Sequence, residues 1–190
     1  MWRTITPGEK SPLRRAVFLD RDGVINRGVV RGDRPFAPLS LDEFEILPGV
    51  PEALARLRAA GFLLVVVTNQ PDVARGFARR DQVEAIHAFI RARLPLDEVR
   101  VCYHDDVDRC ACRKPRPGML YAAAVANDIR LDRSFLVGDR WRDIGAGKEA
   151  GCTAVLVNPF PEPKRIEPDA ELADLPAAAD WILETAAETG

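Results

Sequence analysis

The sequence predicts an α/β fold, a doubly wound and Rossmann-like parallel sheet, for three reasons. Short apolar runs of strand length alternate along the chain with segments of helical periodicity. The apolar runs are continuous, as expected of strands that are buried on both faces. Polar residues directly follow several of these runs, at the carboxyl ends of the strands, where sheets of this kind bind their ligands.

The elements follow in order from the first apolar run, AVFL (16–19), which ends at an acidic residue as a buried strand of this fold would. Segment 48–60 has leucines at helical spacing, and Gly61 supplies a helix stop. FLLVVV (62–67) is the second predicted strand. The later elements are strands at 99–103, 134–138 and 153–157, helices at 81–93, 117–127, 141–150 and 177–187, and a proline-rich turn at 160–168.

The segment 24–47 is the exception to this alternation. It holds glycines and prolines at four places, and we expect a long loop or flap near the functional site. No insertion is large enough to form a cap domain, although this segment could cover part of the site. At 190 residues the chain is expected to form one domain, 1–190.

Charge and hydropathy narrow the classes of function. The net charge of −2 and the pI of about 5.8 argue against a strongly basic nucleic-acid surface. The longest apolar runs are far shorter than the roughly 20 residues of a membrane-spanning helix, and the first residues lack the apolar stretch of a signal peptide. We therefore expect a cytoplasmic protein with no membrane or nucleic-acid partner, in which cysteines stay reduced.

Two acidic motifs follow two separate predicted strands. Asp20 and Asp22 lie in FLDRDG, after the first strand, and Asp139 and Asp143 lie in GDRWRD. A single aspartate at such a place is more often a turn former or a helix cap. Two pairs at one edge of a sheet instead favour a hard cation held between carboxylates, and Mg²⁺ suits that arrangement.

Other polar residues are expected near these acids. Thr68 and Asn69 end the second strand, where they are either simple capping residues or ligands of a phosphate. Arg113, Lys114 and Arg116 precede the predicted helix 117–127 and form either a solvated basic turn or a group that contacts a phosphoryl oxygen.

A cysteine–histidine cluster lies between these basic residues and the third strand. Cys102, His104, Cys110 and Cys112 have the spacing C-x-H-x5-C-x-C and predict a structural zinc site with four protein ligands. The alternative is that Cys102 is a core thiol and the other cysteines are incidental. His87 is mid-helix and is expected at the surface or in the core, without a catalytic role.

Together the motifs resemble the four motifs of haloacid dehalogenase (HAD) phosphatases. The resemblance covers roughly residues 16–157 and implies that Asp20 attacks phosphorus and forms an aspartyl-phosphate. Asp22 would then protonate the leaving oxygen and activate water, while Thr68 and Lys114 hold phosphoryl oxygens. The implied Mg²⁺ site comprises Asp20, the backbone carbonyl of Asp22, and Asp139, with Asp143 in support.

The zinc loop and the segment TNQPDVARG are similar to the small capless HAD group that contains D-glycero-D-manno-heptose 1,7-bisphosphate phosphatases and histidinol-phosphate phosphatases. The segment most resembles the heptose enzymes, although Pro71 and Asp72 replace Ser-Gly, and the loop after the first motif also departs from their pattern. The resemblance implies a small phosphorylated metabolite as substrate, contacted by Asn69, Arg75, Arg113 and Arg116.

Three alternatives stay open at this point. Histidinol phosphate is the rival substrate, and a polynucleotide 3′-phosphatase is a more distant one. A binding protein that keeps the HAD fold without catalysis belongs to another class, but it would be expected to lack an acid or the lysine, and all are present. The absence of a large cap predicts an open site and a monomer.

Overall fold

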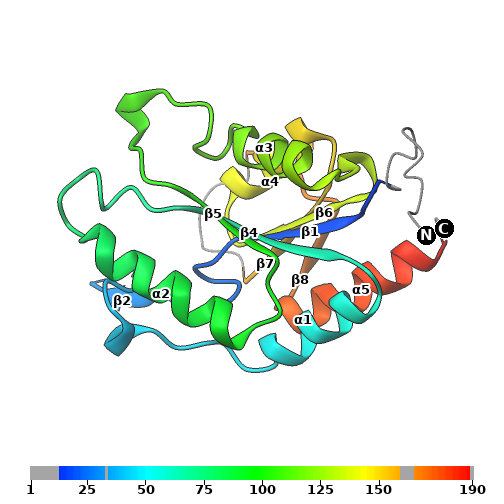
Figure 1. Ribbon diagram of the computed structural model, residues 1–190, viewed down its shortest axis with the longest axis horizontal. Helices are drawn as coiled ribbons and strands as arrows, with labels where there is room; N and C mark the ends of the chain where they lie inside the picture. The colour runs from blue at the N-terminus through cyan, green and yellow to red at the C-terminus, as the bar shows by residue number, and fades with distance from the viewer. Residues whose placement is uncertain (1–12, 33, 159–164, 189–190) are drawn as a thin grey trace, which may run out of the picture.

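A parallel sheet of six strands forms the centre of the molecule (Figure 1). The computed structural model describes residues 13–32, 34–158 and 165–188. In the sheet the order is β5-β4-β1-β6-β7-β8, so the first strand lies in the interior. The strand bounds are β1 Ala16–Leu19, β4 Leu63–Asn69, β5 Glu98–Cys102, β6 Phe135–Gly138, β7 Thr153–Val157 and β8 Ala170–Leu172.

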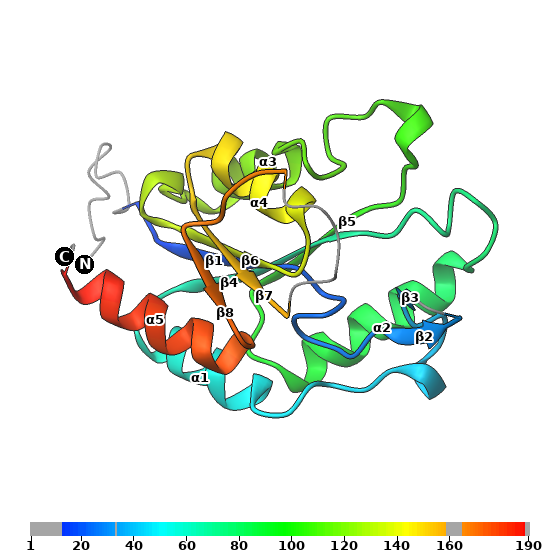
Figure 2. The same cartoon turned by 180° about the vertical axis from the view of Figure 1, so that it is seen from behind.

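Helices cover both faces of the sheet, as the doubly wound prediction requires (Figures 1 and 2). One face carries α1 (Val50–Ala59), α2 (Arg80–Arg93) and α5 (Leu175–Glu188). The other face carries α3 (Gly118–Asn127) and α4 (Trp141–Ala150). The predicted α/β fold is confirmed, with shifts of a few residues at the ends of elements.

Alternate residues of the buried strands pack into two separate cores. Val17 and Leu19 of β1 belong to the core beneath α1 and α5, whereas Phe18 between them belongs to the core beneath α3 and α4. Successive side chains of a strand point to opposite faces, so a strand that is buried on both sides must be apolar throughout. This explains why continuous apolar runs, and not alternating ones, identified the strands.

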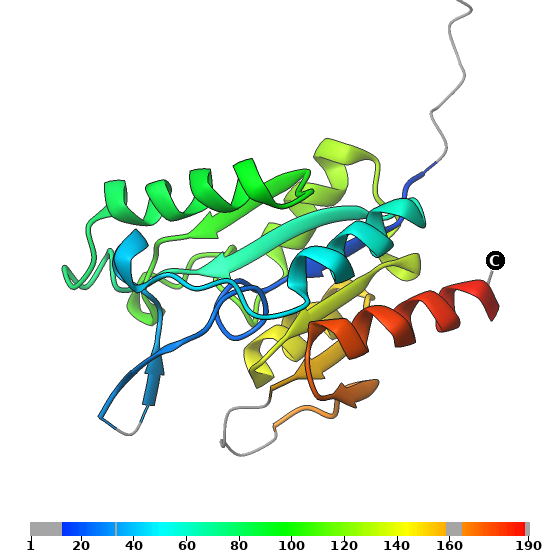
Figure 3. The same cartoon turned by 90° about the horizontal axis from the view of Figure 1, so that it is seen from below.

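The structure corrects two expectations. Segment 24–47 is not simply a loop: β2 (Val29–Arg31) and β3 (Arg34–Phe36) form an antiparallel hairpin that stands away from the main sheet (Figure 3), and a 3₁₀ helix covers Leu41–Glu43. Strand β8 was not predicted, since it is only three residues long and contains an exposed glutamate. Figure 2 shows β8 at the edge of the sheet beside β7.

Some expectations fall outside the described residues. These include most of the proline-rich turn at 160–168, of which residues 160–164 are not described, and the N-terminal segment before residue 13. Two short 3₁₀ helices, Asp106–Asp108 and Leu131–Arg133, complete the elements of the described part. Within it, no helix has the length and the apolar character that crossing a bilayer requires.

Candidate active site and cysteine–histidine loop

Three carboxylates gather at the carboxyl ends of two neighbouring strands. Asp20 follows β1, Asp139 follows β6, and β1 pairs with β6 in the sheet. Asp143 lies in the first turn of α4, which begins just beyond Asp139. One ligand atom of each residue lies within 4.8 Å of the others, and all three residues are buried. We call these three residues, together with Lys114, the acidic centre.

Two glycines make this close approach possible. A Cβ atom at Gly138 would lie 2.1 Å from the Cβ of Asp143, and one at Gly23 would lie 2.5 Å from Oδ2 of Asp139. Gly23 also has a φ of +86°, which glycine adopts without steric cost. The two backbone positions are therefore shaped around the carboxylates, and a larger residue at either would displace one of them.

Lys114 provides the positive charge of the acidic centre. Its Nζ lies 2.6 Å from Oδ1 of Asp20 and 2.5 Å from Oδ1 of Asp143, and it donates to the carbonyl oxygen of Val67 at 2.7 Å. Asn69, at the end of β4, fixes the backbone of Lys114 by donating to its carbonyl and accepting from its N–H, both at 3.1 Å. The lysine is thus held from both its backbone and its ammonium.

The electrostatics of the acidic centre favour the binding of a divalent cation. Burial, together with the charges of Asp143 and Asp22, raises the pKa of Asp20 to about 7 despite the opposing effect of Lys114. Burial and the charge of Asp20 also raise the pKa of Asp139 well above its ordinary range. Oδ1 of Asp139 is buried and has no hydrogen-bond partner. A hard divalent cation would both supply that partner and relieve the repulsion, and Mg²⁺ binds carboxylate oxygens of this kind.

Lys114 stays charged in this setting. Burial alone would lower its pKa, but Asp143 and Asp20 together raise it above its ordinary value. The ammonium is therefore a permanent positive charge beside Oδ1 of Asp20, where it can stabilise negative charge on a neighbouring group.

Asp22 lies apart from the three carboxylates, although it is two residues from Asp20. Its oxygens accept hydrogen bonds from Asn26 at 3.0 Å and from Gln70 at 2.8 Å, as well as from Arg21. Burial raises its pKa, but the charge of Arg21 and the bonds from Asn26 and Gln70 outweigh burial, so the pKa lies below its ordinary value. Asp22 is therefore a fixed, ionised carboxylate in this state.

Gln70 connects Asp22 with the end of the second predicted strand. Its Nε2 donates to Oδ2 of Asp22 at 2.8 Å and to Oγ1 of Thr68 at 2.9 Å. Thr68 is buried at the tip of β4, next to the strand that carries Asp20. Sequence reasoning singled out Thr68 but missed Gln70, whose side-chain donor sets the orientation of both partners.

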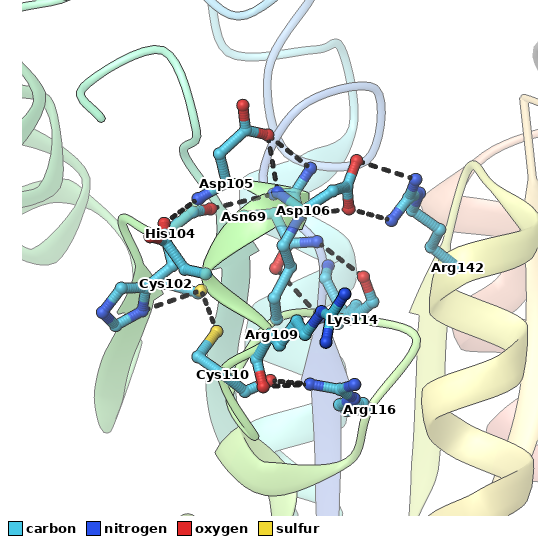
Figure 4. A network of polar contacts seen from close by, with 12 residues as sticks. Asn69, Cys102, His104, Asp105, Asp106, Arg109, Cys110, Lys114, Arg116 and Arg142 are labelled. Carbon is cyan, nitrogen blue, oxygen red and sulfur yellow. Dashed lines mark hydrogen bonds and ion pairs between the residues drawn. The ribbon is translucent and has the colours of Figure 1, made fainter. Parts of the chain in front are cut away.

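The four residues of the predicted zinc site converge. Sulfur–sulfur distances are 3.7 Å from Cys102 to Cys110, 3.3 Å from Cys102 to Cys112 and 3.4 Å from Cys110 to Cys112, and Nδ1 of His104 lies 3.3 Å from the Cys112 sulfur. Zinc–sulfur bonds of about 2.3 Å in a tetrahedron would place sulfurs about 3.8 Å apart. The cluster therefore has the dimensions of a closed tetrahedral zinc site, and Figure 4 shows His104 and Cys110 directed at Cys102.

An ion-pair network joins the cysteine–histidine loop, residues 102–113, to its surroundings (Figure 4). Asp105 accepts from Arg75 at 2.6 Å, which ties the loop to the segment after β4. Asp106 accepts from Arg113 at 2.8 Å and from Arg142 of α4 at 2.9 Å. The guanidinium groups of Arg75 and Arg113 are thus paired with aspartates in this state.

A cavity of about 230 Å³ lies beside Lys114 along this network. Four arginines line it, and Arg116 among them donates to the carbonyl of Cys110 at 2.7 Å. They are Arg109, Arg113, Arg116 and Arg142. Asp105 and Asp106 also line it and pair with arginines, and a bound anionic group could take the place of these aspartates. Of the predicted substrate ligands, Arg113 and Arg116 line this cavity, whereas Arg75 does not line it and is paired with Asp105.

Sequence reasoning also missed the partners of His87. The residue lies on α2 and is buried, as one of the two expectations had it, but it does not lack partners: Nε2 lies 3.0 Å from Nη1 of Arg21. Arg21, which lies between Asp20 and Asp22 in the sequence, has a completely buried side chain. In the sequence, the one hint of the Arg21–His87 contact is an arginine that lies between two acids. The sequence does not point to His87 as its partner, because His87 is 66 residues away.

Comparisons with known proteins agree with this geometry. A profile of the HAD-hydrolase-like family matches residues 111–188. The chain is similar to D-glycero-beta-D-manno-heptose-1,7-bisphosphate 7-phosphatase of Escherichia coli strain K12, with 38% identity over 91% of this chain and 90% of the relative. It is also similar to D-glycero-D-manno-heptose-1,7-bisphosphate 7-phosphatase of Thermosynechococcus vestitus, with 35% identity over 89% of this chain and 95% of the relative.

A solved structure gives the same result at the level of fold. The D,D-heptose 1,7-bisphosphate phosphatase of B. bronchiseptica, crystallised with magnesium and phosphate, superposes with a TM-score of 0.77 at 35% identity. The match covers 90% of this chain and 99% of that chain.

Proposed function

The chain belongs to the D-glycero-D-manno-heptose-1,7-bisphosphate phosphatase family of HAD-like hydrolases, and from this membership we propose that its acidic centre removes a phosphoryl group from a heptose bisphosphate with the help of Mg²⁺. The observation that supports the proposal most strongly is the convergence of Asp20, Asp139 and Asp143 within 4.8 Å. Lys114 at 2.6 Å from Asp20 adds the cation that phosphoryl transfer requires.

We assign the metal to the residues that fit it. Asp20, Asp139, Asp143 and the backbone carbonyl of Asp22 would hold Mg²⁺, which, when bound, neutralises negative charge on the phosphoryl oxygens and on the attacking carboxylate. The unpartnered Oδ1 of Asp139 and the raised pKa of Asp20 support this assignment. The solved relative from B. bronchiseptica contains magnesium, which agrees with it.

Asp20 is the proposed nucleophile. Its carboxylate oxygen attacks phosphorus, and the bond from phosphorus to the sugar oxygen breaks, so that an aspartyl-phosphate forms. Lys114 and the hydroxyl of Thr68 hold the phosphoryl oxygens during this step. Asp22 supplies the proton that the departing sugar oxygen takes up.

The second displacement reverses the role of Asp22. Its carboxylate takes a proton from water, the water oxygen bonds to phosphorus, and the bond to Asp20 breaks, which releases inorganic phosphate. The first step needs a protonated Asp22, although its pKa is low in this state. Negative phosphoryl oxygens beside Asp22 would raise its pKa when substrate binds, because like charges disfavour ionisation.

The second phosphate of a bisphosphate substrate would bind in the arginine-lined cavity. Arg113 and Arg116 lie in its wall and Lys114 joins it to the acidic centre, so one molecule could span both. Arg75 and Asn69 contribute through their contacts, the first by holding Asp105 and the second by holding the backbone of Lys114. The paired arginines would exchange aspartate partners for phosphate.

The zinc cluster is proposed to be structural. All four ligand positions of the tetrahedron come from Cys102, His104, Cys110 and Cys112, which leaves no open position for substrate. Metal at this position would fix the loop that carries Arg113 and leads to Lys114.

Three further assignments complete the proposal. We propose that residues 1–190 form one phosphatase domain and that the protein acts as a monomer, since a single chain supplies the whole acidic centre. None of the four cysteines forms a disulfide, which suits a reducing compartment, so we propose the cytoplasm. Gel filtration with light scattering tests the oligomeric state.

A panel of phosphoesters tests the activity. Purified protein with Mg²⁺ is expected to hydrolyse a heptose 1,7-bisphosphate with a kcat/KM at least about tenfold above heptose monophosphates and histidinol phosphate, since only the bisphosphate occupies both sites. The matched variant is Arg116→Met, which should erase much of the preference for the bisphosphate. A higher kcat/KM for histidinol phosphate than for any sugar phosphate would overturn the substrate assignment.

A further inference from the structure

Arg21 connects the proposed proton donor with a helix outside the acidic centre. The side chain is fully buried. Its Nε donates to Oδ1 of Asp22 at 3.2 Å, and its Nη2 lies 3.0 Å from both oxygens of Asp22. Its remaining terminal nitrogen, Nη1, lies 3.0 Å from Nε2 of His87 on α2.

The direction of the Arg21–His87 hydrogen bond is fixed by chemistry. A guanidinium only donates, so Nε2 of His87 must accept and therefore carries no proton. The ring is then neutral, with its proton on Nδ1, which faces the Glu84 carboxylate at 3.7 Å. Burial and the charge of Arg21 lower the pKa of His87 to about 4, which agrees with this geometry.

His87 thereby determines how Arg21 is oriented. A buried guanidinium must satisfy its donors, and one left without an acceptor would turn or draw water into the site. With Nη1 bound to His87, the other edge of the planar group is directed at Asp22. The remaining bonds to Asp22, from Asn26 and Gln70, come from other directions.

We propose that His87 is a positioning residue for the hydrolysis: by accepting a hydrogen bond from Arg21, it holds the guanidinium against Asp22 and so orients the carboxyl group that exchanges a proton with the leaving oxygen. The inference rests on the proposed function, because it needs Asp22 as the proton donor. His87 touches neither the substrate nor the reacting atoms and acts through Arg21.

Two substrates separate positioning from simple structural support. A sugar bisphosphate has an alkoxide leaving group that needs a proton, whereas p-nitrophenyl phosphate releases a phenolate that is stable without one. A displaced Asp22 should therefore lower kcat/KM for the first substrate much more than for the second. The ratio kcat/KM reports the steps up to release of the leaving group and leaves out the second displacement, which both substrates share. A helix that is merely less stable would lower the amount of active enzyme and so affect both substrates equally.

The experiment compares four variants of the full chain, each measured as kcat/KM per folded enzyme with Mg²⁺ present. His87→Leu and His87→Asn should lower kcat/KM for the sugar bisphosphate about tenfold or more, and kcat/KM for p-nitrophenyl phosphate less than about threefold. His87→Gln, whose amide oxygen reaches about as far as Nε2, should restore kcat/KM for the sugar bisphosphate to within about threefold of the wild type. Ile90→Ala, a core change on the same helix, should leave both kcat/KM values unchanged.

The Gln and Asn variants keep the test decisive if His87→Leu does not fold, because both retain a polar amide and differ only in reach. Equal kcat/KM values for these two variants on the sugar bisphosphate, or equal losses on both substrates, would overturn the assignment of His87. The same follows if Ile90→Ala reproduces the pattern of His87→Leu. A wild-type protein that hydrolyses no phosphoester would contradict the proposed function itself, which distinguishes the two failures.

Discussion

The acidic centre and the cysteine–histidine loop both gather side chains that can hold a metal, but different forces hold them in place. Asp20 and Asp139 follow buried strands that pair with each other, so the sheet itself sets their distance. Among residues 102–113 only Cys102 is fully buried, and Val107 is 82% exposed. That loop is held by its own sulfur–nitrogen cluster and by ion pairs.

This difference predicts which of the two regions should depend on a metal ion for its stability. A sheet that buries apolar strands folds without an ion, and the carboxylates at its edge then repel one another until a cation arrives. A loop with no core has little else to fix it, so metal binding supplies its folding free energy. Loss of Mg²⁺ should therefore abolish activity and spare the fold, whereas loss of zinc should loosen the loop and weaken activity.

The largest expected effect follows from removing the nucleophile. Asp20→Asn keeps the shape of the side chain but cannot attack phosphorus, so kcat should fall on the order of 10⁴-fold or more. Steady-state kinetics on the heptose bisphosphate measures this, with circular dichroism to confirm that the fold is kept. An Asp20→Asn protein with full activity would remove Asp20 as nucleophile.

A substitution at a backbone contact of the acidic centre comes next. In Gly138→Ala the new Cβ would meet Asp143 at 2.1 Å, so a strand or a carboxylate must move. We expect a loss of about 3 kcal/mol or more in the free energy of unfolding, together with much weaker binding of Mg²⁺. Denaturant unfolding measures it, and Gly147→Ala, where the nearest atoms lie at 3.2 Å, is the control that should cost far less.

Removal of the zinc cluster should have a smaller effect on catalysis. The double variant Cys110→Ser with Cys112→Ser is expected to lose equimolar zinc and about 10- to 100-fold in kcat/KM, because Lys114 and Arg113 are no longer held by a rigid loop. Elemental analysis and kinetics measure the two losses. The concentration of Mg²⁺ that gives half the maximal rate should stay near the wild-type value, and no zinc in the wild type would refute the cluster.

The smallest expected effect is the change with pH in how much Mg²⁺ stabilises the fold against heat. The raised pKa of Asp20, about 7 against an ordinary 3.8, means that the magnesium-free fold is favoured at low pH and loses stability as the pH rises toward 7. Added Mg²⁺ should therefore raise the unfolding temperature more at pH 8 than at pH 5, with a gain of about 2–3 kcal/mol when Mg²⁺ is at 100 times its Kd. Differential scanning calorimetry measures the unfolding temperature at both pH values.

An equal gain in unfolding temperature at both pH values would contradict the raised pKa of Asp20. The zinc-free double variant is the control and should show the same pH trend as the wild type.

The sequence predicted the five longer strands of the sheet and the acids at their tips because both signals are local. A continuous apolar run followed by an aspartate is visible in a few adjacent residues, and the cluster C-x-H-x5-C-x-C is as well. Parallel pairing then brings the tips of β1 and β6 together without further information. The same locality accounts for the correct prediction that segment 24–47 interrupts the alternation.

What the sequence did not reveal depends on contacts between distant segments. The hairpin β2–β3 escaped because its strands are three residues long and mostly not buried, and β8 escaped for the same reason. The bond from Arg21 to His87 joins the segment after β1 to α2 across 66 residues, and no periodicity marks it. The pairing of Arg75 with Asp105 is also non-local, so its prediction as a substrate ligand could not foresee an aspartate partner.

The most direct test of the account measures the phosphatase rate as a function of Mg²⁺ concentration for the wild type and for Asp139→Asn. If Asp139 helps to hold the ion that Asp20 and Asp143 share, the variant should need at least about tenfold more Mg²⁺ for half its maximal rate, and the wild type should be inactive when Mg²⁺ is withheld. Asp132→Asn, which alters an exposed aspartate paired with Arg130, should leave that concentration unchanged. A full wild-type rate without divalent cation, or the same half-saturating concentration in Asp139→Asn, would contradict the claim that these carboxylates form the catalytic metal site.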